Sequence, residues 1–249
     1  MKKLLNEFSE LIKIINTKTL IATIILIFLG LFAQFYDLGP QENFYDLLVK
    51  CFSNYLFFST ILIAISINIV SISNNYKTSN YILKHKNYKE YLNNLLRKNL
   101  LYITFIIVIS LILVIIMSLS GTGFKIENIS SIYPNLSIYL YAIYHLLRVI
   151  IYVYLLSIII FYIEKRFKTN FVFLIIIFIL ISYFVPLNYD NMPIYKISMM
   201  YPFVINYITA SSFSNFSLDI ICSIIQVIKL IMIIMLSRYL CIDKRKENL

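Results

Sequence analysis

The sequence predicts an all-α integral membrane protein with a single membrane domain over residues 1–249. Sixty per cent of the residues are hydrophobic and only 14% are charged, and the mean hydropathy is +0.82. The apolar residues form six long continuous stretches rather than an alternating pattern, which indicates helices. A hydrocarbon core of ~30 Å takes roughly 20 helical residues, and the backbone in lipid must satisfy its own hydrogen bonds. We therefore expect six transmembrane helices, at residues 19–35, 47–72, 100–119, 138–163, 170–185 and 218–236.

The basic residues are sorted between the links that join these spans. Seventeen of the 22 Lys and Arg residues lie at the two termini and in the second and fourth links. The positive-inside rule then places both termini in the cytoplasm, in agreement with an even number of spans. We expect a multi-pass protein of a bacterial plasma membrane, surrounded by membrane lipids. The net charge of +10 reflects this topology and does not indicate a nucleic-acid partner, because the basic residues cluster at span ends.

Residues 1–18 precede the first span and have apolar residues at helical spacing. This pattern predicts an amphipathic helix that lies in the inner headgroup layer. The alternative is a simple extension of the first span. The apolar residues are Leu4, Phe8, Leu11, Ile12 and Ile15.

The second link, residues 73–99, is the longest cytoplasmic connection and is basic. It also has an apolar face, which a solvated loop would not need. The link either rests on anionic lipid headgroups or inserts into a groove of a cytoplasmic partner. The apolar face includes Tyr81, Tyr88, Tyr91, Leu92 and Leu95.

The last outer link, residues 186–217, is also unusual for its position. It contains three prolines and is nevertheless apolar. Non-helical backbone at membrane depth is tolerated only where it packs on protein or lines a wet cavity. We expect a partly re-entrant segment that dips into the outer leaflet before the sixth span.

This layout resembles the permease subunits of type 2 ABC exporters over the whole chain. The short chain and its composition are similar, more narrowly, to small permeases that export antimicrobial peptides such as lantibiotics or give immunity to them. The family's acidic residue after the second span is missing, because residues 73–80 contain no acid. The resemblance implies transport of a peptide or lipid-like substrate, an ABC ATPase subunit docked on residues 80–98, and a second permease subunit, identical or paralogous. The alternative is a non-transporting immunity, sensor or accessory protein that binds a ligand or partner.

Motifs for catalysis are missing from the chain. There is no G-x-x-x-x-G-K-[ST] phosphate-binding loop, so ATP is expected on the partner subunit and no cofactor is expected here. The two histidines, His85 and His145, lie far apart, and the three cysteines lack metal-ligand spacing, so we expect neither a metal site nor an enzyme. Polar residues of the second span, among them Thr60, Ser66 and Asn68, are expected to join helices.

Two cations interrupt the spans near the membrane midplane. Arg148 lies ~15 Å from the start of the fourth span and Lys229 ~16 Å from the start of the sixth. A charge at that depth is costly and should face the bundle or a wet cavity. His145 and Gln226 each precede one of them by three residues and share its helix face. These faces line a polar path or a subunit seam, where they contact an anionic lipid, a peptide carboxylate or an acidic residue of a second permease. The alternative is that the two cationic side chains snorkel and hydrogen-bond to neighbouring carbonyls.

Overall fold

The computed structural model describes residues 17–37, 55–75, 87–122, 137–167 and 216–243. The described residues form five α-helices and contain no strand, which confirms the all-α class. The helices are α2 (Thr17–Asp37), α4 (Tyr55–Asn75), α6 (Tyr88–Thr122), α7 (Ile138–Arg166) and α11 (Phe216–Asp243).

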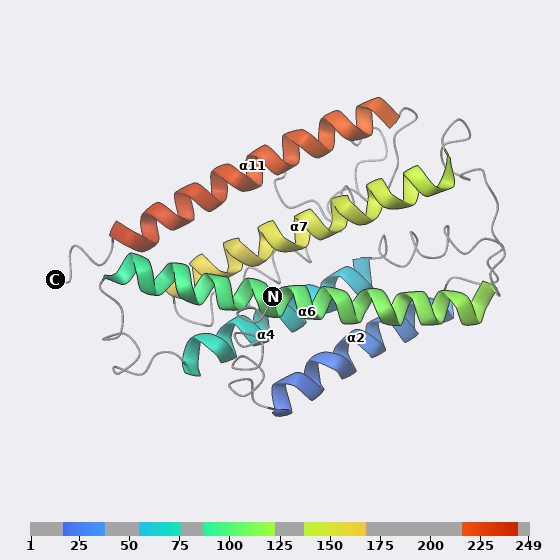
Figure 1. The fold of residues 1–249 in the computed structure, drawn as a ribbon, viewed down its shortest axis with the longest axis horizontal. Helices are drawn as coiled ribbons and strands as arrows, with labels where there is room; N and C mark the ends of the chain where they lie inside the picture. Colours follow the sequence, from blue (N-terminus) through green and yellow to red (C-terminus); the bar gives the residue numbers. More distant parts are fainter. Residues whose placement is uncertain (1–16, 38–54, 76–86, 123–136, 168–215, 244–249) are drawn as a thin grey trace, which may run out of the picture.

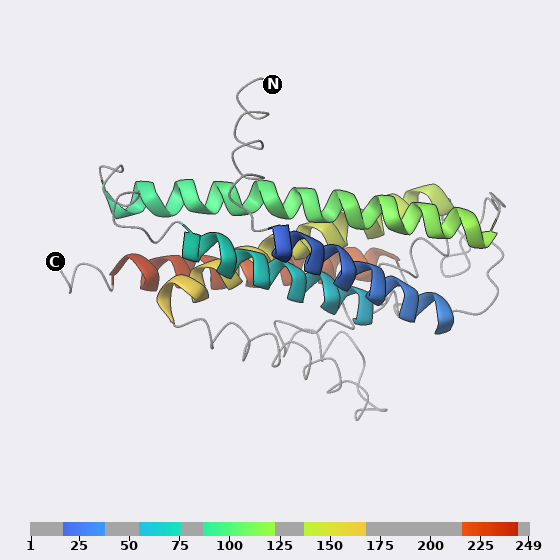
Figure 2. The ribbon, with the colours of Figure 1, turned by 90° about the horizontal axis from the view of Figure 1, so that it is seen from below.

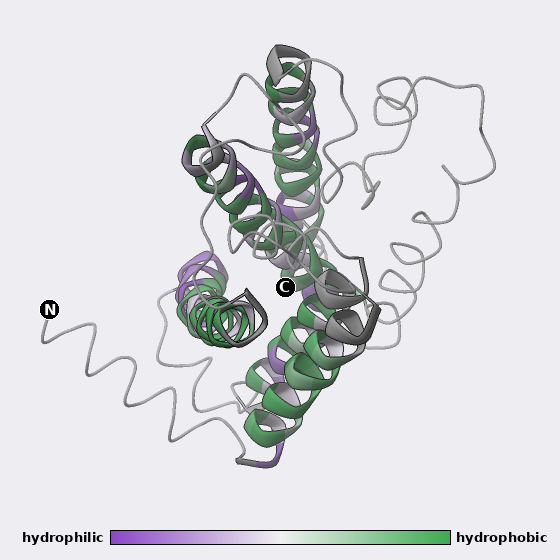
Figure 3. Cartoon of the chain, turned by 90° about the vertical axis from the view of Figure 1, so that its right-hand side faces the viewer, coloured by the Kyte–Doolittle hydropathy of each residue, from purple (hydrophilic) through white to green (hydrophobic). Residues whose placement is uncertain are grey.

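Three of these helices are long and apolar enough to cross a membrane. Their apolar parts are Tyr88–Leu119, Tyr139–Arg166 and Ser223–Ile242. Lys18–Phe32 of α2 and Thr60–Asn74 of α4 are shorter apolar helices. Figure 3 shows, along the bundle axis, that hydrophobic residues cover most of the helices. The membrane-helical character expected from the sequence is therefore present in the fold.

The helices lie side by side in an elongated bundle (Figures 1 and 2). α2 and α6 run in one direction along it, and α4 and α7 run in the other (Figure 1). α11 is parallel to α7, so the connection between them joins opposite ends of the bundle. In an 18-residue apolar stretch of each of these helices, 56% is buried in α7, 33% in α6 and 17% in α11. α7 is therefore the central helix of these three, and α11 lies at the edge.

Four of the six expected spans, residues 19–35, 100–119, 138–163 and 218–236, fall within described helices. The second span was expected to begin at residue 47, whereas the structure describes its helix only from Tyr55. The fifth span, residues 170–185, lies outside the described residues. So do residues 1–16 of the N-terminal segment and residues 186–215 of the outer link.

The structure differs from the expectation at α6, which is one unbroken helix of 35 residues. Its first turns belong to the link expected over residues 73–99, so residues 88–99 of this basic link and the third span form one helix. Asn87 caps the helix, since its Oδ1 accepts a hydrogen bond from the Glu90 N–H at 2.8 Å, and Glu90 complements the helix dipole. No Gly or Pro occurs between Tyr88 and Ser120, so nothing interrupts the helix there.

The helix directions bring the basic residues to one end of the bundle, which we call the basic end. The starts of α2 and α6 and the ends of α4, α7 and α11 point toward it (Figure 1). In the described helices, only Arg148 and Lys229 lie away from it. The residues of the basic end are Lys18, Lys89, Arg97, Lys98, Lys165, Arg166 and Arg238.

Candidate functional site: a polar seam between α7 and α11

The parallel helices α7 and α11 form one of the two most extensive helix contacts of the described bundle. Tyr144, Arg148 and Tyr152 follow one another at intervals of four residues, so they lie along one face of α7. The Tyr144 hydroxyl lies 2.9 Å from the Ser223 hydroxyl of α11. The Tyr152 hydroxyl donates to the Ser223 carbonyl oxygen at 3.2 Å. Ser223 thus joins two turns of α7 to α11 in a seam of polar side chains.

The Arg148 guanidinium lies in the middle of this seam. Its Nη2 donates to Nδ1 of His145 at 2.9 Å, and its Cζ lies 5.6 Å from the centroid of the Tyr144 ring. A guanidinium can only donate, so Nδ1 is the acceptor of a neutral imidazole and the ring proton is on Nε2. His145 is fully buried and Arg148 is 4% exposed. The imidazole and the phenol ring therefore hold the guanidinium in place inside the bundle.

The structure places the four residues of the predicted path in two groups. His145 and Arg148 are brought together, as their spacing of three residues predicts. Gln226 is buried on α11 one turn from Ser223, on the face that packs toward α7. Lys229 is half-buried and lies one turn further along α11. Sequence reasoning did not single out Ser223, Tyr144 or Tyr152 for the seam, although the interval of four residues between the tyrosines and Arg148 is a signal for it.

A groove of about 350 Å³ lies between the two helices. The surface that it exposes is apolar, because Arg148, Tyr152 and Ser223 at its floor are buried, Tyr144 is half-buried, and its edges are apolar side chains that are 45–54% exposed. Val227 contributes a partly buried apolar side chain to the lining. The floor consists of Tyr144, Arg148, Tyr152 and Ser223, and the edges of Leu147, Ile151, Ile224 and Ile228.

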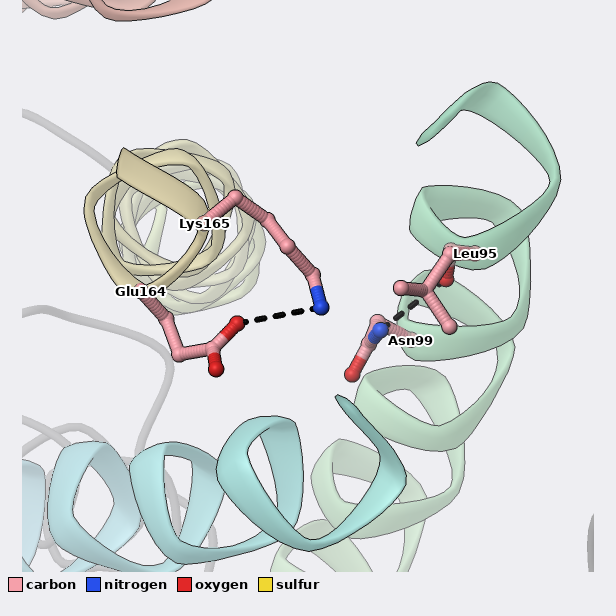
Figure 4. A network of polar contacts seen from close by, with 4 residues as sticks. All are labelled: Leu95, Asn99, Glu164 and Lys165. Carbon is pink, nitrogen blue, oxygen red and sulfur yellow. Dashed lines mark hydrogen bonds and ion pairs between the residues drawn. The ribbon is translucent and has the colours of Figure 1, made fainter. Parts of the chain in front are cut away.

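A second polar cluster lies at the basic end (Figure 4). Lys165 Nζ is 3.2 Å from Glu164 Oε2, with side chains only 6% and 1% exposed. Lys165 points from α7 toward Asn99 of α6, whose Nδ2 donates to the Leu95 carbonyl at 2.9 Å. A buried ion pair adds little net stability because both charges lose their hydration. Both of its residues belong to α7, and the pair lies beside Asn99 of α6.

The residues expected to dock an ATPase lie partly in the core of the bundle and partly outside the described residues. Tyr81 lies outside the described residues. Tyr91, Leu92 and Leu95 are buried in the apolar core. Tyr88 is half-buried, with its ring 5.7 Å from that of Tyr91, and it shares a hydrogen bond with Cys241 of α11. The apolar face of this segment therefore packs within the bundle.

The opposite face of the first turns of α6 is open to solvent or to a partner. It consists of Asn87, Lys89, Glu90, Asn93 and Arg97, all exposed. Because Tyr88 contacts the last turn of α11, these turns are supported by a second helix end. We call residues 87–97, with this exposed polar face, the α6 knob.

Comparisons with known proteins assign no family to this chain. No protein-family model matches the chain, and neither a curated protein nor a solved structure is found to match it. Among the described residues, no group of three His, Cys, Asp or Glu side chains could hold a metal ion. The geometry of the seam and of the α6 knob thus carries the functional argument.

Proposed function

We propose that this chain is the membrane-spanning permease subunit of an ATP-driven exporter that moves a peptide or lipid-like substrate outward. The observation that carries the proposal is the continuity of α6. The α6 knob and a complete apolar crossing belong to one helix, Tyr88–Thr122. A partner that binds the knob would therefore hold one end of a rigid element that reaches the opposite side of the membrane.

The length of α6 supports this role. At 1.5 Å per residue, 35 residues extend over ~52 Å, whereas the hydrocarbon core is ~30 Å thick. The basic first turns would thus stand beyond the core, and the long apolar part would cross it. Movement of the knob would shift α6 against α7, with which it shares the buried cluster of Asn99, Glu164 and Lys165.

The seam between α7 and α11 supports transport rather than simple anchoring. A helix that only anchors a protein in lipid needs no buried arginine, because a charge at mid-depth costs several kcal/mol. Here Arg148, His145 and Ser223 form a polar strip among apolar helices. We propose that this strip belongs to the substrate path, and that the halves of a permease pair rock around it in alternating access.

The remaining assignments follow from this role. ATP would be hydrolysed on a separate ABC subunit that binds the α6 knob from the cytoplasm. A second permease, identical or paralogous, would complete the pathway. Because α7 and α11 are parallel, one further crossing is needed between them, and the expected fifth span would provide it. This supports six spans, with both termini in the cytoplasm of a bacterial cell.

Purification from native membranes in mild detergent tests the proposal. We expect an ATPase with a phosphate-binding loop to co-purify, and we expect its recovery to fall about tenfold when the knob charge is reversed by Lys89→Glu with Arg97→Glu. Loss of interface interactions worth ~1.4 kcal/mol corresponds to such a change. Ile116→Ala, on an exposed apolar position of the same helix, is the control and should leave recovery unchanged.

Failure to recover any ATPase from membranes of the native host would contradict the proposal. It would favour the alternative of a non-transporting immunity, sensor or accessory protein that binds its ligand at the seam. If the knob substitutions leave the recovery of the ATPase unchanged, the ATPase binds another surface of the basic end.

A further inference from the structure

The first half of α6 carries a second groove, of about 380 Å³. α6 lies along one side of the bundle (Figure 2). The described residues that line the groove recur every three or four positions, so they share one face of the helix and extend along it for ~16 Å. They are Asn93, Leu96, Arg97, Leu100, Leu101 and Thr104.

This groove changes from polar to apolar along its length. Asn93 and Arg97, toward the basic end, are exposed, so their polar groups are open to a ligand. The leucines that line it are half-buried and present apolar surface. The groove between α7 and α11, by contrast, exposes apolar surface only. A ligand with one polar and one apolar part matches the groove on α6.

The deep end of the groove offers apolar contacts. The Thr104 hydroxyl donates to the Leu100 carbonyl oxygen at 2.9 Å, and its oxygen lies 2.7 Å from the Tyr154 hydroxyl of α7. A threonine hydroxyl has one proton, so Tyr154 is the donor in this second bond. The proton of Thr104 is thus used within the protein. The side-chain donors that the groove offers to a ligand lie at the Asn93 and Arg97 end.

The hydropathy of α6 gives the depth of the groove in the membrane. No charged residue occurs from Asn99 to Thr122, and the expected third span begins at Leu100. Arg97 lies three residues earlier, ~4.5 Å along the helix, at the level of the headgroups. The apolar part of the groove then lies at the level of the lipid chains. A soluble protein could reach Arg97 but could not follow the groove into the hydrocarbon core.

The charge of the basic end selects an anionic ligand. In the described helices this end has seven Lys and Arg residues and three acids, Glu90, Glu164 and Asp243. A positive surface attracts the anionic lipids of the facing leaflet. The Arg97 guanidinium is planar and can donate two parallel hydrogen bonds to a phosphate group. A zwitterionic headgroup gains less, because its own cation offsets the charge of its phosphate.

We propose that this groove binds an anionic phospholipid of the leaflet at the basic end, with its phosphate on Arg97 and an acyl chain along Leu100 and Thr104. The face that periodicity singled out, with Tyr91 and Leu95, is buried in the core, and the groove lies on the opposite face of α6. The inference goes beyond the proposed function and does not depend on it, since it requires only that α6 crosses a membrane.

Photolabelling of the full chain in nanodiscs, without any partner protein, tests this site. The probes are phosphatidylglycerol and phosphatidylcholine with a diazirine at the same position of the acyl chain. We expect phosphatidylglycerol to label residues 96–104 about fivefold more, as ~1 kcal/mol for one cation near an anionic headgroup predicts. Ile112 and Ile116 of α6 are exposed and far from any charged residue of the helix. Both probes should label them equally, which provides an internal control.

Variants then locate the headgroup. Arg97→Gln should remove the preference for phosphatidylglycerol, whereas Arg97→Lys should keep part of it, because an ammonium retains the charge without the planar pair of donors. Lys89→Gln is the matched control, since it removes an exposed cation of α6 that does not line the groove. It should leave the preference intact. These substitutions are at exposed positions, where effects on stability are usually small.

Equal labelling of residues 96–104 by the two lipids would overturn the inference. Absence of label there, with normal labelling of Ile112 and Ile116, would also overturn it, because a second copy or another segment would then cover the groove. A preference that survives Arg97→Gln would place the headgroup on another cation of the basic end and would contradict the site. Recovery of an ATPase is measured separately, so either proposal can fail while the other stands.

Discussion

The pairs α2–α4 and α7–α11 make the two most extensive helix contacts in the described bundle, and they do so in opposite ways. Gly30 of α2 lies directly against Thr60 of α4, and a Cβ at Gly30 would collide with that side chain. Asn68 of α4 donates to the Thr23 hydroxyl at 2.6 Å. Small residues thus let two backbones approach closely, and a polar pair joins them.

The α7–α11 pair instead meets through large side chains. Tyr144, Arg148 and Tyr152 stand between the helices and reach Ser223 through hydroxyl groups. Such side chains reach across the seam, and the groove of about 350 Å³ lies along it. The comparison teaches that polar residues in a membrane bundle have two uses. They form a single hydrogen bond beside a close backbone contact, as in α2–α4, or a row of hydrogen bonds beside a groove, as in α7–α11.

The largest expected effect comes from breaking the close contact of α2 and α4. Gly30→Leu should destabilise the protein by about 2 kcal/mol or more, because overpacking forces the two helices apart. Ala22→Leu changes an exposed position of the same helix and should be nearly neutral. Thermal unfolding in detergent measures both. Equal stability of the two variants would show that α2 and α4 do not approach at Gly30.

The second effect tests the buried pair of the seam. Arg148→Met leaves the His145 acceptor buried without its donor, and His145→Phe removes the acceptor of the guanidinium; each should cost about 1–3 kcal/mol. The double variant should cost clearly less than the two together, with a coupling energy of about 0.5–3 kcal/mol. Reversible unfolding of the four proteins gives this value. Strict additivity would mean that the two side chains do not interact.

The smallest effect concerns the Thr23–Asn68 hydrogen bond. Hydrogen bonds between membrane helices contribute about 0.6 kcal/mol on average. A double-mutant cycle with Thr23→Val and Asn68→Leu should therefore give a coupling energy near that value, below that of the His145–Arg148 pair. A reversed order of the two coupling energies would contradict the distinction between a joining contact and a charged seam.

Several features of the fold and site were accessible from sequence because they depend on local spacing. The His145–Arg148 contact follows from an interval of three residues on a helix. The role of Asn68 in joining helices was also expected and is confirmed by its bond to Thr23. Ser66, expected to act in the same way, instead donates to the Leu62 carbonyl of its own helix, a common alternative for a short hydroxyl side chain.

Other features depend on neighbours that are distant in sequence. The apolar face of the α6 knob can lie on lipid, on a partner or on the bundle, and periodicity does not distinguish these surroundings. The fold places Tyr91, Leu92 and Leu95 in the core. A signal for the start of α6 was available in the Asn-x-x-Glu cap at residues 87–90. Its continuity follows from the lack of Gly and Pro after that cap.

By itself, the sequence determined the all-α class, the apolar helices and the sorting of charge toward one end. These properties depend on hydropathy and on helical spacing, which act over a few neighbouring residues. Tertiary structure alone decided that α7 and α11 are parallel, that Ser223 meets Tyr144 and Tyr152, and that a groove with Arg148 on its floor lies between them. The physical reason is that packing selects among faces of similar hydropathy by the size and shape of side chains from distant helices.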